Sequence, residues 1–127
     1  MPLLWHIDDG EHLLAVSEAT VLLAASWRFE AFTTGAEALQ EYAQRPVAER
    51  PDVILMDYFI GYERGDTVTR ALRHLDPRPS RTRIMGHSSV RRASESIVAA
   101  GGDGILTKHS TPEGINPSLL AWLQEQR

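Results

Sequence analysis

The chain has 127 residues, of which 43% are hydrophobic and 24% charged, and this balance is typical of a soluble globular protein with a single domain over residues 1–127. The formal net charge of −4 argues against nucleic acid as a direct partner, because proteins that bind a phosphate backbone usually present a basic surface. The absence of cysteine excludes disulfide bonds, thiol chemistry and cysteine-based zinc sites, and it fits a cytoplasmic protein.

Short apolar runs alternate along the chain with longer stretches in which apolar residues recur at helical spacing. In chain order they predict a strand over 3–7, a helix over 11–26, a strand over 28–33, a helix over 34–44, a strand over 53–56, a helix over 66–75, a strand over 83–87, a helix over 90–100, a strand over 104–107 and a helix from 116. Thr34 and Glu37 form a capping-box pair, and Pro117 follows Asn116 at the first position of the last helix. The stretch with Gly61 and Gly65 is predicted to be a loop.

Alternation of strands and helices predicts a doubly wound α/β domain, with a parallel sheet between two layers of helices. The run Val53–Met56 is apolar throughout, which suits a central strand covered on both faces. The N-terminus lacks a basic region followed by a long apolar core, so we expect no signal peptide. No apolar run approaches the roughly 20 residues that span a bilayer, so we expect no membrane insertion.

Polar side chains follow four of the predicted strands. Asp8 and Asp9 follow the first strand, Asp57 the third, Ser88 the fourth and Lys108 the fifth. Since the carboxyl ends of parallel strands lie along one edge, we expect these side chains to meet in one cleft. Three carboxylates cannot all stay ionised together without a counter-charge, and oxygen ligands without histidine or cysteine favour a hard cation such as Mg²⁺ (or Mn²⁺).

This set of groups suits a phosphoryl group. Asp57 can attack phosphorus and form an acyl phosphate. The metal ion, Lys108 and the Ser88 hydroxyl can then bear the charge on the equatorial oxygens, since phosphoryl transfer depends mainly on positioning and electrostatics.

At this point the chain resembles the receiver domains of two-component response regulators, including the single-domain chemotaxis type. The matching pieces are Ile7-Asp8-Asp9, the run from Pro51 to Asp57, Gly65, Ser88, Ala100-Gly101 and Leu106-Thr107-Lys108. Their order and spacing together, rather than any single piece, make the resemblance, and it covers nearly the whole chain. It implies a flavodoxin-like (βα)5 three-layer sandwich with a five-stranded parallel sheet in the order 2-1-3-4-5.

The resemblance also implies a metal site. Asp9 and Asp57 would bind the ion directly, the backbone carbonyl of Phe59 would be the third protein ligand, and Asp8 would act through water. It implies further that Asp57 accepts a phosphoryl group from a phosphohistidine on a sensor histidine kinase or a phosphotransfer protein.

Around the acceptor, the resemblance implies that Lys108 holds the phosphoryl group and that Ser88 swings toward it on activation. The chain would then be a signalling domain rather than an enzyme, promoting only its own phosphoryl transfer and dephosphorylation. Its output would pass to an unknown downstream protein through the surface between the fourth and fifth helices.

Two positions depart from the pattern of the family, and two others are expected to modulate the activity of the site. His109 replaces the usual proline after the lysine, where the peptide is normally cis, and a cis bond before histidine costs about 3–4 kcal/mol. Ile105 replaces the usual aromatic residue, which weakens the readout that such a ring provides. Phe59 and Val90 stand at positions that tune dephosphorylation in the family, and two apolar side chains there predict slow self-hydrolysis.

Two other functions stay open. His109 and Ile105 suggest a receiver-like binding module that is not phosphorylated. A phosphatase-like hydrolase with an aspartyl nucleophile is the other alternative, although such enzymes usually have a second acid where Phe59 stands. His87 and His109 are each interpreted as a packed or surface histidine rather than as a metal ligand or catalytic group.

Overall fold

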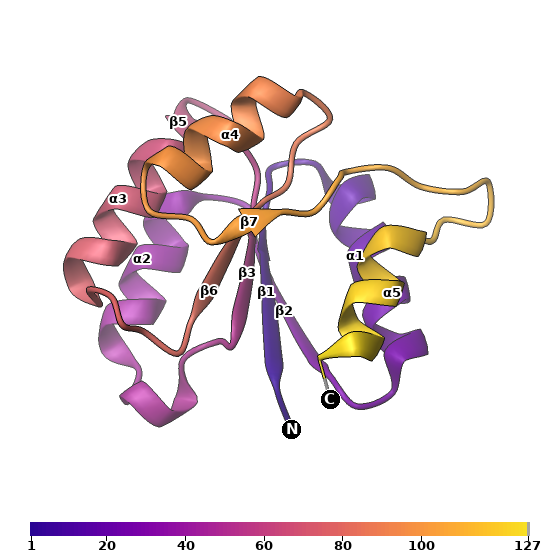
Figure 1. Ribbon diagram of the computed structural model, residues 1–127, viewed down its shortest axis with the longest axis horizontal. Helices are drawn as coiled ribbons and strands as arrows, with labels where there is room; N and C mark the ends of the chain where they lie inside the picture. Colours follow the sequence, from indigo (N-terminus) through magenta and orange to yellow (C-terminus); the bar gives the residue numbers. More distant parts are fainter. Residues whose placement is uncertain (127) are drawn as a thin grey trace.

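The computed structural model describes residues 1–126 and shows the predicted alternation of strands and helices (Figure 1). Within that range five strands form the main sheet: β1 (Leu3–Ile7), β2 (Arg28–Phe32), β3 (Val53–Met56), β6 (Arg83–Gly86) and β7 (Gly104–Ile105). Neighbouring strands are parallel, in the order β2-β1-β3-β6-β7. Numbered among themselves, these strands have the expected order 2-1-3-4-5, so the doubly wound fold is confirmed.

The described residues contain five α-helices: α1 (Glu11–Ala24), α2 (Gly35–Gln44), α3 (Gly65–Leu75), α4 (Arg91–Ala99) and α5 (Pro117–Glu125). Figure 1 shows α1 and α5 on one face of the sheet and α2, α3 and α4 on the other, which makes three layers. The side chains of Thr34 and Asn116 each accept a backbone hydrogen bond at 3.1 Å from the first turn of their helix, so both predicted helix starts are confirmed.

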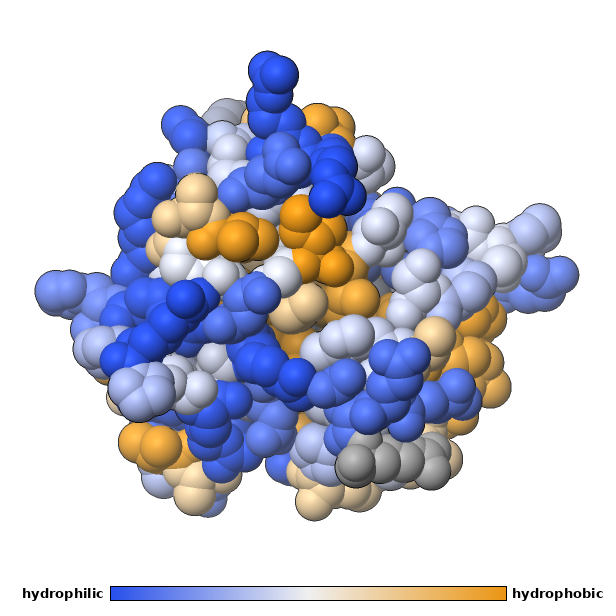
Figure 2. Space-filling model, viewed as in Figure 1, coloured by the Kyte–Doolittle hydropathy of each residue, from blue (hydrophilic) through white to orange (hydrophobic). Residues whose placement is uncertain are grey.

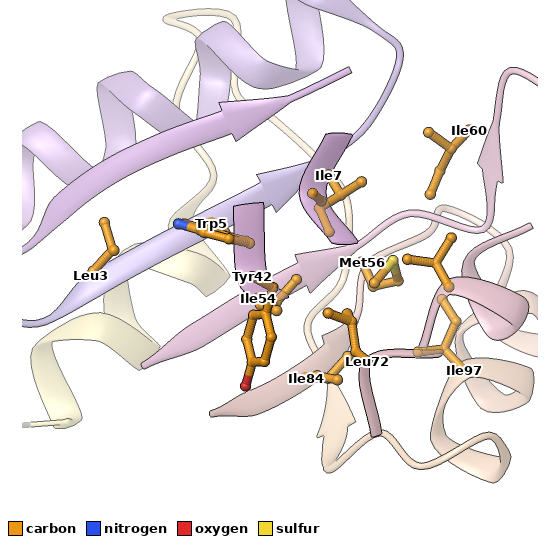
Figure 3. Packing of buried hydrophobic residues seen from close by; sticks show 12 residues of the cluster. Leu3, Trp5, Ile7, Tyr42, Ile54, Met56, Ile60, Leu72, Ile84 and Ile97 are labelled. Atoms are coloured by element: carbon orange, nitrogen blue, oxygen red, sulfur yellow. The ribbon is translucent and has the colours of Figure 1, made fainter. Parts of the chain in front are cut away.

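The sheet has a hydrophobic core on each face, because successive residues of a strand point to opposite sides. Leu3, Trp5 and Ile7 pack against α2, α3 and α4, and Figure 3 shows this cluster, whereas Leu4 packs on the side of α1 and α5. Burying each large apolar side chain contributes about 1.5–3 kcal/mol. The carboxyl ends of the strands are therefore held in place by a well-packed core on each face of the sheet. Of the tryptophans, Trp5 and Trp27 are buried and Trp122 is half-buried.

The segment after β3 differs from the predicted loop. It forms an antiparallel hairpin of β4 (Phe59–Ile60) and β5 (Glu63–Arg64), and Gly61 lies in its turn with a φ of +60°. Strands of two residues are too short to show an alternating pattern, so the sequence did not reveal them. Gly65 then begins α3 so close to Asp57 that a Cβ atom would lie 1.9 Å from the Asp57 carbonyl oxygen.

Two helices are shorter than the sequence predicted. Helix α1 ends at Ala24 because Ala25 adopts a left-handed conformation with a φ of 64°. Helix α4 begins one residue later than expected and ends one residue earlier. None of the helices in residues 1–126 has the length and apolar character needed to cross a bilayer.

Candidate functional site

The four expected acidic and basic side chains meet at the carboxyl edge of the sheet. Asp8 and Asp9 follow β1, Asp57 follows β3, and Lys108 follows β7. Carboxylate oxygens of Asp8, Asp9 and Asp57 all lie within 4.8 Å of one another. Asp8 and Asp57 are buried and Asp9 is exposed, so the cluster reaches from the interior to the surface.

Lys108 is the only lysine in the sequence, and its ammonium lies inside this cluster. Its Nζ atom is 2.7 Å from Oδ2 of Asp8 and 2.9 Å from Oδ1 of Asp57. The side chain is 13% exposed, so water screens these two ion pairs only in part. The expected meeting of the acids with Lys108 is therefore present in the structure.

The surroundings shift the pKa values of the two buried carboxyl groups in opposite directions. Burial opposes ionisation of Asp8, but contacts with His6, Lys108 and the Gly10 amide outweigh it and hold the pKa of Asp8 well below its usual range. Burial raises the pKa of Asp57, the charge of Asp8 adds to this effect, and Lys108 opposes it. Asp8 is thus a fixed anion, and Asp57 is the carboxylate that gains most from an added positive charge.

The donor set fits a hard divalent cation. Three carboxyl groups face one ammonium, so a divalent cation would balance the excess negative charge that remains when these groups are ionised. Carboxylate oxygens at this spacing are the ligands that Mg²⁺ prefers. Because Lys108 is in contact with Asp8 and Asp57, an arriving cation and the ammonium compete for the same oxygens.

The β4–β5 hairpin borders the acids on one side. The backbone amide of Gly61, in the turn of the hairpin, donates a hydrogen bond of 3.0 Å to Oδ2 of Asp9. The amide of Tyr58 donates to Oδ1 of Asp57 at 2.9 Å. These bonds hold the backbone around Phe59 next to the carboxylates, where its carbonyl was expected to act as a ligand.

Ser88 lies at the end of β6 but is engaged in a turn. Its hydroxyl accepts a hydrogen bond from the Val90 amide at 3.1 Å, and its own amide donates to the Ser94 hydroxyl at 3.1 Å. The predicted Ser88 is therefore at the expected edge of the sheet, with its hydroxyl turned to the start of α4. Because the hydroxyl oxygen only accepts in the bond with Val90, its O–H remains able to donate to a group on Asp57.

The four residues expected to modulate the site differ in exposure and lie on different elements. Phe59 is 65% exposed and Val90 54% exposed, and both line one groove between the hairpin and α4. Ile105 is half-buried on β7. His109 is exposed, with its Nε2 atom 2.8 Å from the Ser118 hydroxyl, as expected for a surface histidine. The Lys108–His109 peptide is trans, since Arg78–Pro79 is the one cis bond in residues 1–126.

The expectation that no histidine lies near the acids is wrong. His6 is fully buried in β1, and its Nε2 atom is 3.2 Å from Oδ2 of Asp8. Burial lowers the pKa of His6 and keeps the ring neutral. The sequence did contain a signal, because His6 is a polar residue within an apolar strand and shares a strand face with Asp8.

Comparison with known proteins finds solved structures that are similar to this chain. The sequence matches no family model and no curated protein. The chemotaxis protein CheY4 of Vibrio cholerae is 25% identical, with a TM-score of 0.75 and 98% of both chains covered. The response regulator domain of CheB from Thermotoga maritima is 18% identical, with a TM-score of 0.77 over 98% of this chain and 95% of the other. A response regulator protein from Burkholderia pseudomallei, solved with a phosphorylated aspartic acid, a calcium ion and citrate, is 23% identical, with a TM-score of 0.70 over 98% and 67% of the two chains.

Proposed function

We propose that this chain, which has the fold of response-regulator receiver domains, is a switch that accepts a phosphoryl group on Asp57. The observation that supports this most strongly is the position of Lys108 between Asp8 and Asp57, within a cluster of three carboxylates. A phosphoryl group on Asp57 would place its oxygens beside this ammonium. No other described cluster in residues 1–126 joins three carboxylates in this way.

In the proposed reaction, an oxygen of Asp57 attacks the phosphorus of a phosphohistidine. The P–N bond breaks, its electron pair stays on the imidazole of the donor, and an acyl phosphate forms on Asp57. Asp9, Asp57 and the Phe59 carbonyl, with Asp8 through water, would hold a Mg²⁺ or Mn²⁺ ion, which supplies positive charge to the phosphoryl oxygens. Lys108 exchanges its contact with Asp57 for one with a phosphoryl oxygen.

The proposed output is a change in the balance between two conformations, of which a partner protein binds one better. Ser88 gives this change a structural starting point, since its O–H can donate to a phosphoryl oxygen when the side chain swings toward Asp57. Figure 2 shows an apolar area bordered by hydrophilic residues on the face where Figure 1 places α4 and β7. This area suits a protein partner, and a cytoplasmic histidine kinase or phosphotransfer protein would supply the phosphoryl group.

The experiment that tests the proposal is incubation with a small acyl phosphate donor and Mg²⁺, followed by intact-protein mass measurement. We expect one added phosphoryl group that hydroxylamine removes, and no addition to Asp57→Ala or in the presence of a chelator. A wild-type protein that stays unmodified under these conditions would refute phosphorylation and favour the binding module. Continued turnover of a phosphate ester would favour the hydrolase instead.

A further inference from the structure

The strand that leads to Lys108 is very short, and its backbone pairing stops before the lysine. Strand β7 pairs with β6 through Gly104 and Ile105 only. The last backbone hydrogen bond between the two strands runs from the Leu106 amide to the Gly86 carbonyl, at 3.0 Å. Lys108 is therefore outside the part of the sheet whose position the strand ladder determines.

A side chain continues the ladder where the backbone bonds end. The ring of His87 follows β6 directly, and its Nδ1 atom lies 2.8 Å from the carbonyl oxygen of Leu106. The backbone amide of His87 donates to the Met56 carbonyl of β3 at 2.9 Å. His87 thus joins the ends of β3 and β7, the two strands that precede Asp57 and Lys108.

The chemistry of this bond fixes the state of the ring. A carbonyl oxygen only accepts hydrogen bonds, so Nδ1 of His87 must hold the proton and Nε2 the lone pair. Burial lowers the pKa of His87 to about 3, and the ring is therefore neutral at physiological pH. His6 packs edge-on against it, with the ring centroids 5.1 Å apart at 81°. His87 has little freedom to turn away from Leu106.

We infer that His87 is a positioning residue for Lys108. Its ring N–H holds the Leu106 carbonyl, and this bond sets the path of the backbone that brings the Lys108 ammonium between Asp8 and Asp57. A second anchor lies one residue closer to the lysine, where the side-chain amide of Asn116 donates to the Thr107 carbonyl at 3.1 Å. The consequence for phosphorylation rests on the function proposed above, whereas the placement of the ammonium does not.

The test compares two substitutions at this position. His87→Asn keeps an N–H donor near the place of Nδ1. His87→Leu replaces the ring with an apolar side chain of similar size that has no donor. Leu123→Ala, which removes a buried side chain from α5 at a distance from the acids, is the control for loss of stability alone. All measurements use the full chain.

The first measurement is independent of phosphorylation. Because Lys108 is the only lysine, lysine labelled with ¹⁵N at Nζ gives a single side-chain ammonium signal. We expect this signal to move toward that of free lysine in His87→Leu and to stay in place in His87→Asn and Leu123→Ala. An unmoved signal in His87→Leu, or a ¹⁵N-histidine spectrum showing the His87 proton on Nε2, would overturn the inference.

The second measurement separates positioning from general loosening of the fold. A misplaced ammonium lowers the rate of phosphorylation in His87→Leu by about tenfold, and His87→Asn recovers most of the rate. The affinity for Mg²⁺ does not weaken in His87→Leu, because the carboxylates keep their places. Rate and affinity falling together would show that His87 only supports the fold. A wild type without phosphorylation, but with the expected movement of the ammonium signal, would refute the proposed function and leave the inference intact.

Discussion

The ammonium of Lys108 lies 2.9 Å from Oδ1 of Asp57, although the chain from β4 to β7 separates the two residues. The same ammonium is 2.7 Å from Oδ2 of Asp8. Lys108 therefore contacts the two buried carboxylates of the cluster at once and balances part of their negative charge. This relationship determines how the site responds to cations, to pH and to mutation.

The first prediction concerns competition between Lys108 and a metal ion. Lys108→Gln should bind Mg²⁺ about tenfold more tightly than the wild type, because it removes a positive charge a few ångströms from the carboxylates. The same variant should accept the phosphoryl group far more slowly. Calorimetric titration with Mg²⁺ measures the affinity. Arg70→Gln, which removes an exposed charge on α3, is the matched control. Equal or weaker Mg²⁺ binding by Lys108→Gln would show that the ammonium and the ion do not share oxygens.

The second prediction concerns the cost of ionising Asp57. The raised pKa of Asp57, caused mainly by burial and by the charge of Asp8, means that the fold disfavours its ionised form. Asp57→Asn should therefore stabilise the protein in buffer without divalent cations, because the neutral amide avoids the cost of ionising Asp57 in the folded state. Urea unfolding with and without Mg²⁺ measures the effect, and saturating Mg²⁺ should reduce or reverse it. A destabilised Asp57→Asn protein in the absence of Mg²⁺ would count against this charge balance.

The third prediction concerns the lifetime of the phosphoryl group. Phe59 and Val90 line one groove between the hairpin and α4, and we expect their apolar side chains to hinder a water molecule that attacks phosphorylated Asp57. Phe59→Asn should shorten the lifetime of phosphorylated Asp57 by about tenfold. Because Phe59 is 65% exposed, the unfolding free energy should change by less than about 0.5 kcal/mol. Decay of the phosphorylated mass with time measures the lifetime, and equal lifetimes would disprove the role of Phe59.

The fourth prediction concerns stability at low pH. Burial lowers the pKa of His87 from 6.5 to about 3, so between these values the unfolded chain binds a proton that the folded chain does not. The contribution of the neutral His87 ring to the free energy of unfolding is fully present above pH 6.5. It falls by about 1.4 kcal/mol per pH unit as the pH drops from 6.5 toward 3. His87→Asn should have a shallower slope in urea unfolding across this window. Equal slopes would mean that His87 titrates as it does in the unfolded chain.

The fifth prediction concerns the close approach of α3 to the acceptor loop. A Cβ atom on Gly65 would lie 1.9 Å from the Asp57 carbonyl oxygen, and the Gly65 amide donates to the Tyr58 carbonyl at 2.6 Å. Gly65→Ala should therefore destabilise the protein by about 3 kcal/mol, since backbone atoms must move apart. Gly114→Ala, at an open turn position, is a comparison in which only local backbone strain acts. A Gly65→Ala protein as stable as the wild type would show that the loop shifts at little cost.

The sequence predicted the parts of the site that depend on the carboxyl ends of strands. Asp8, Asp57 and Lys108 each follow an apolar run, and a parallel sheet brings such ends to one edge. The contacts beneath this edge were not predictable in the same way. His6 and His87 meet across two strands that are not neighbours in sequence, and a hydrophobic pattern describes one strand at a time.

The loops were also less predictable than the strands. The β4–β5 hairpin has strands too short for alternation, and Gly61 reveals a turn without revealing its partner strands. The direction of the Ser88 hydroxyl depends on a local hydrogen bond that its oxygen accepts from the Val90 amide. The spacing of residues in the sequence does not determine such short hairpins and local hydrogen bonds.

A crystal structure with Mg²⁺ and beryllium fluoride, a mimic of the phosphoryl group, tests the central claim most directly. We expect beryllium on Asp57, the ion on Asp9, Asp57 and the Phe59 carbonyl, and the Lys108 ammonium moved from Asp57 to a fluoride. A structure in which Asp57 binds no beryllium, or in which Lys108 keeps both carboxylates and no ion is bound, would contradict it.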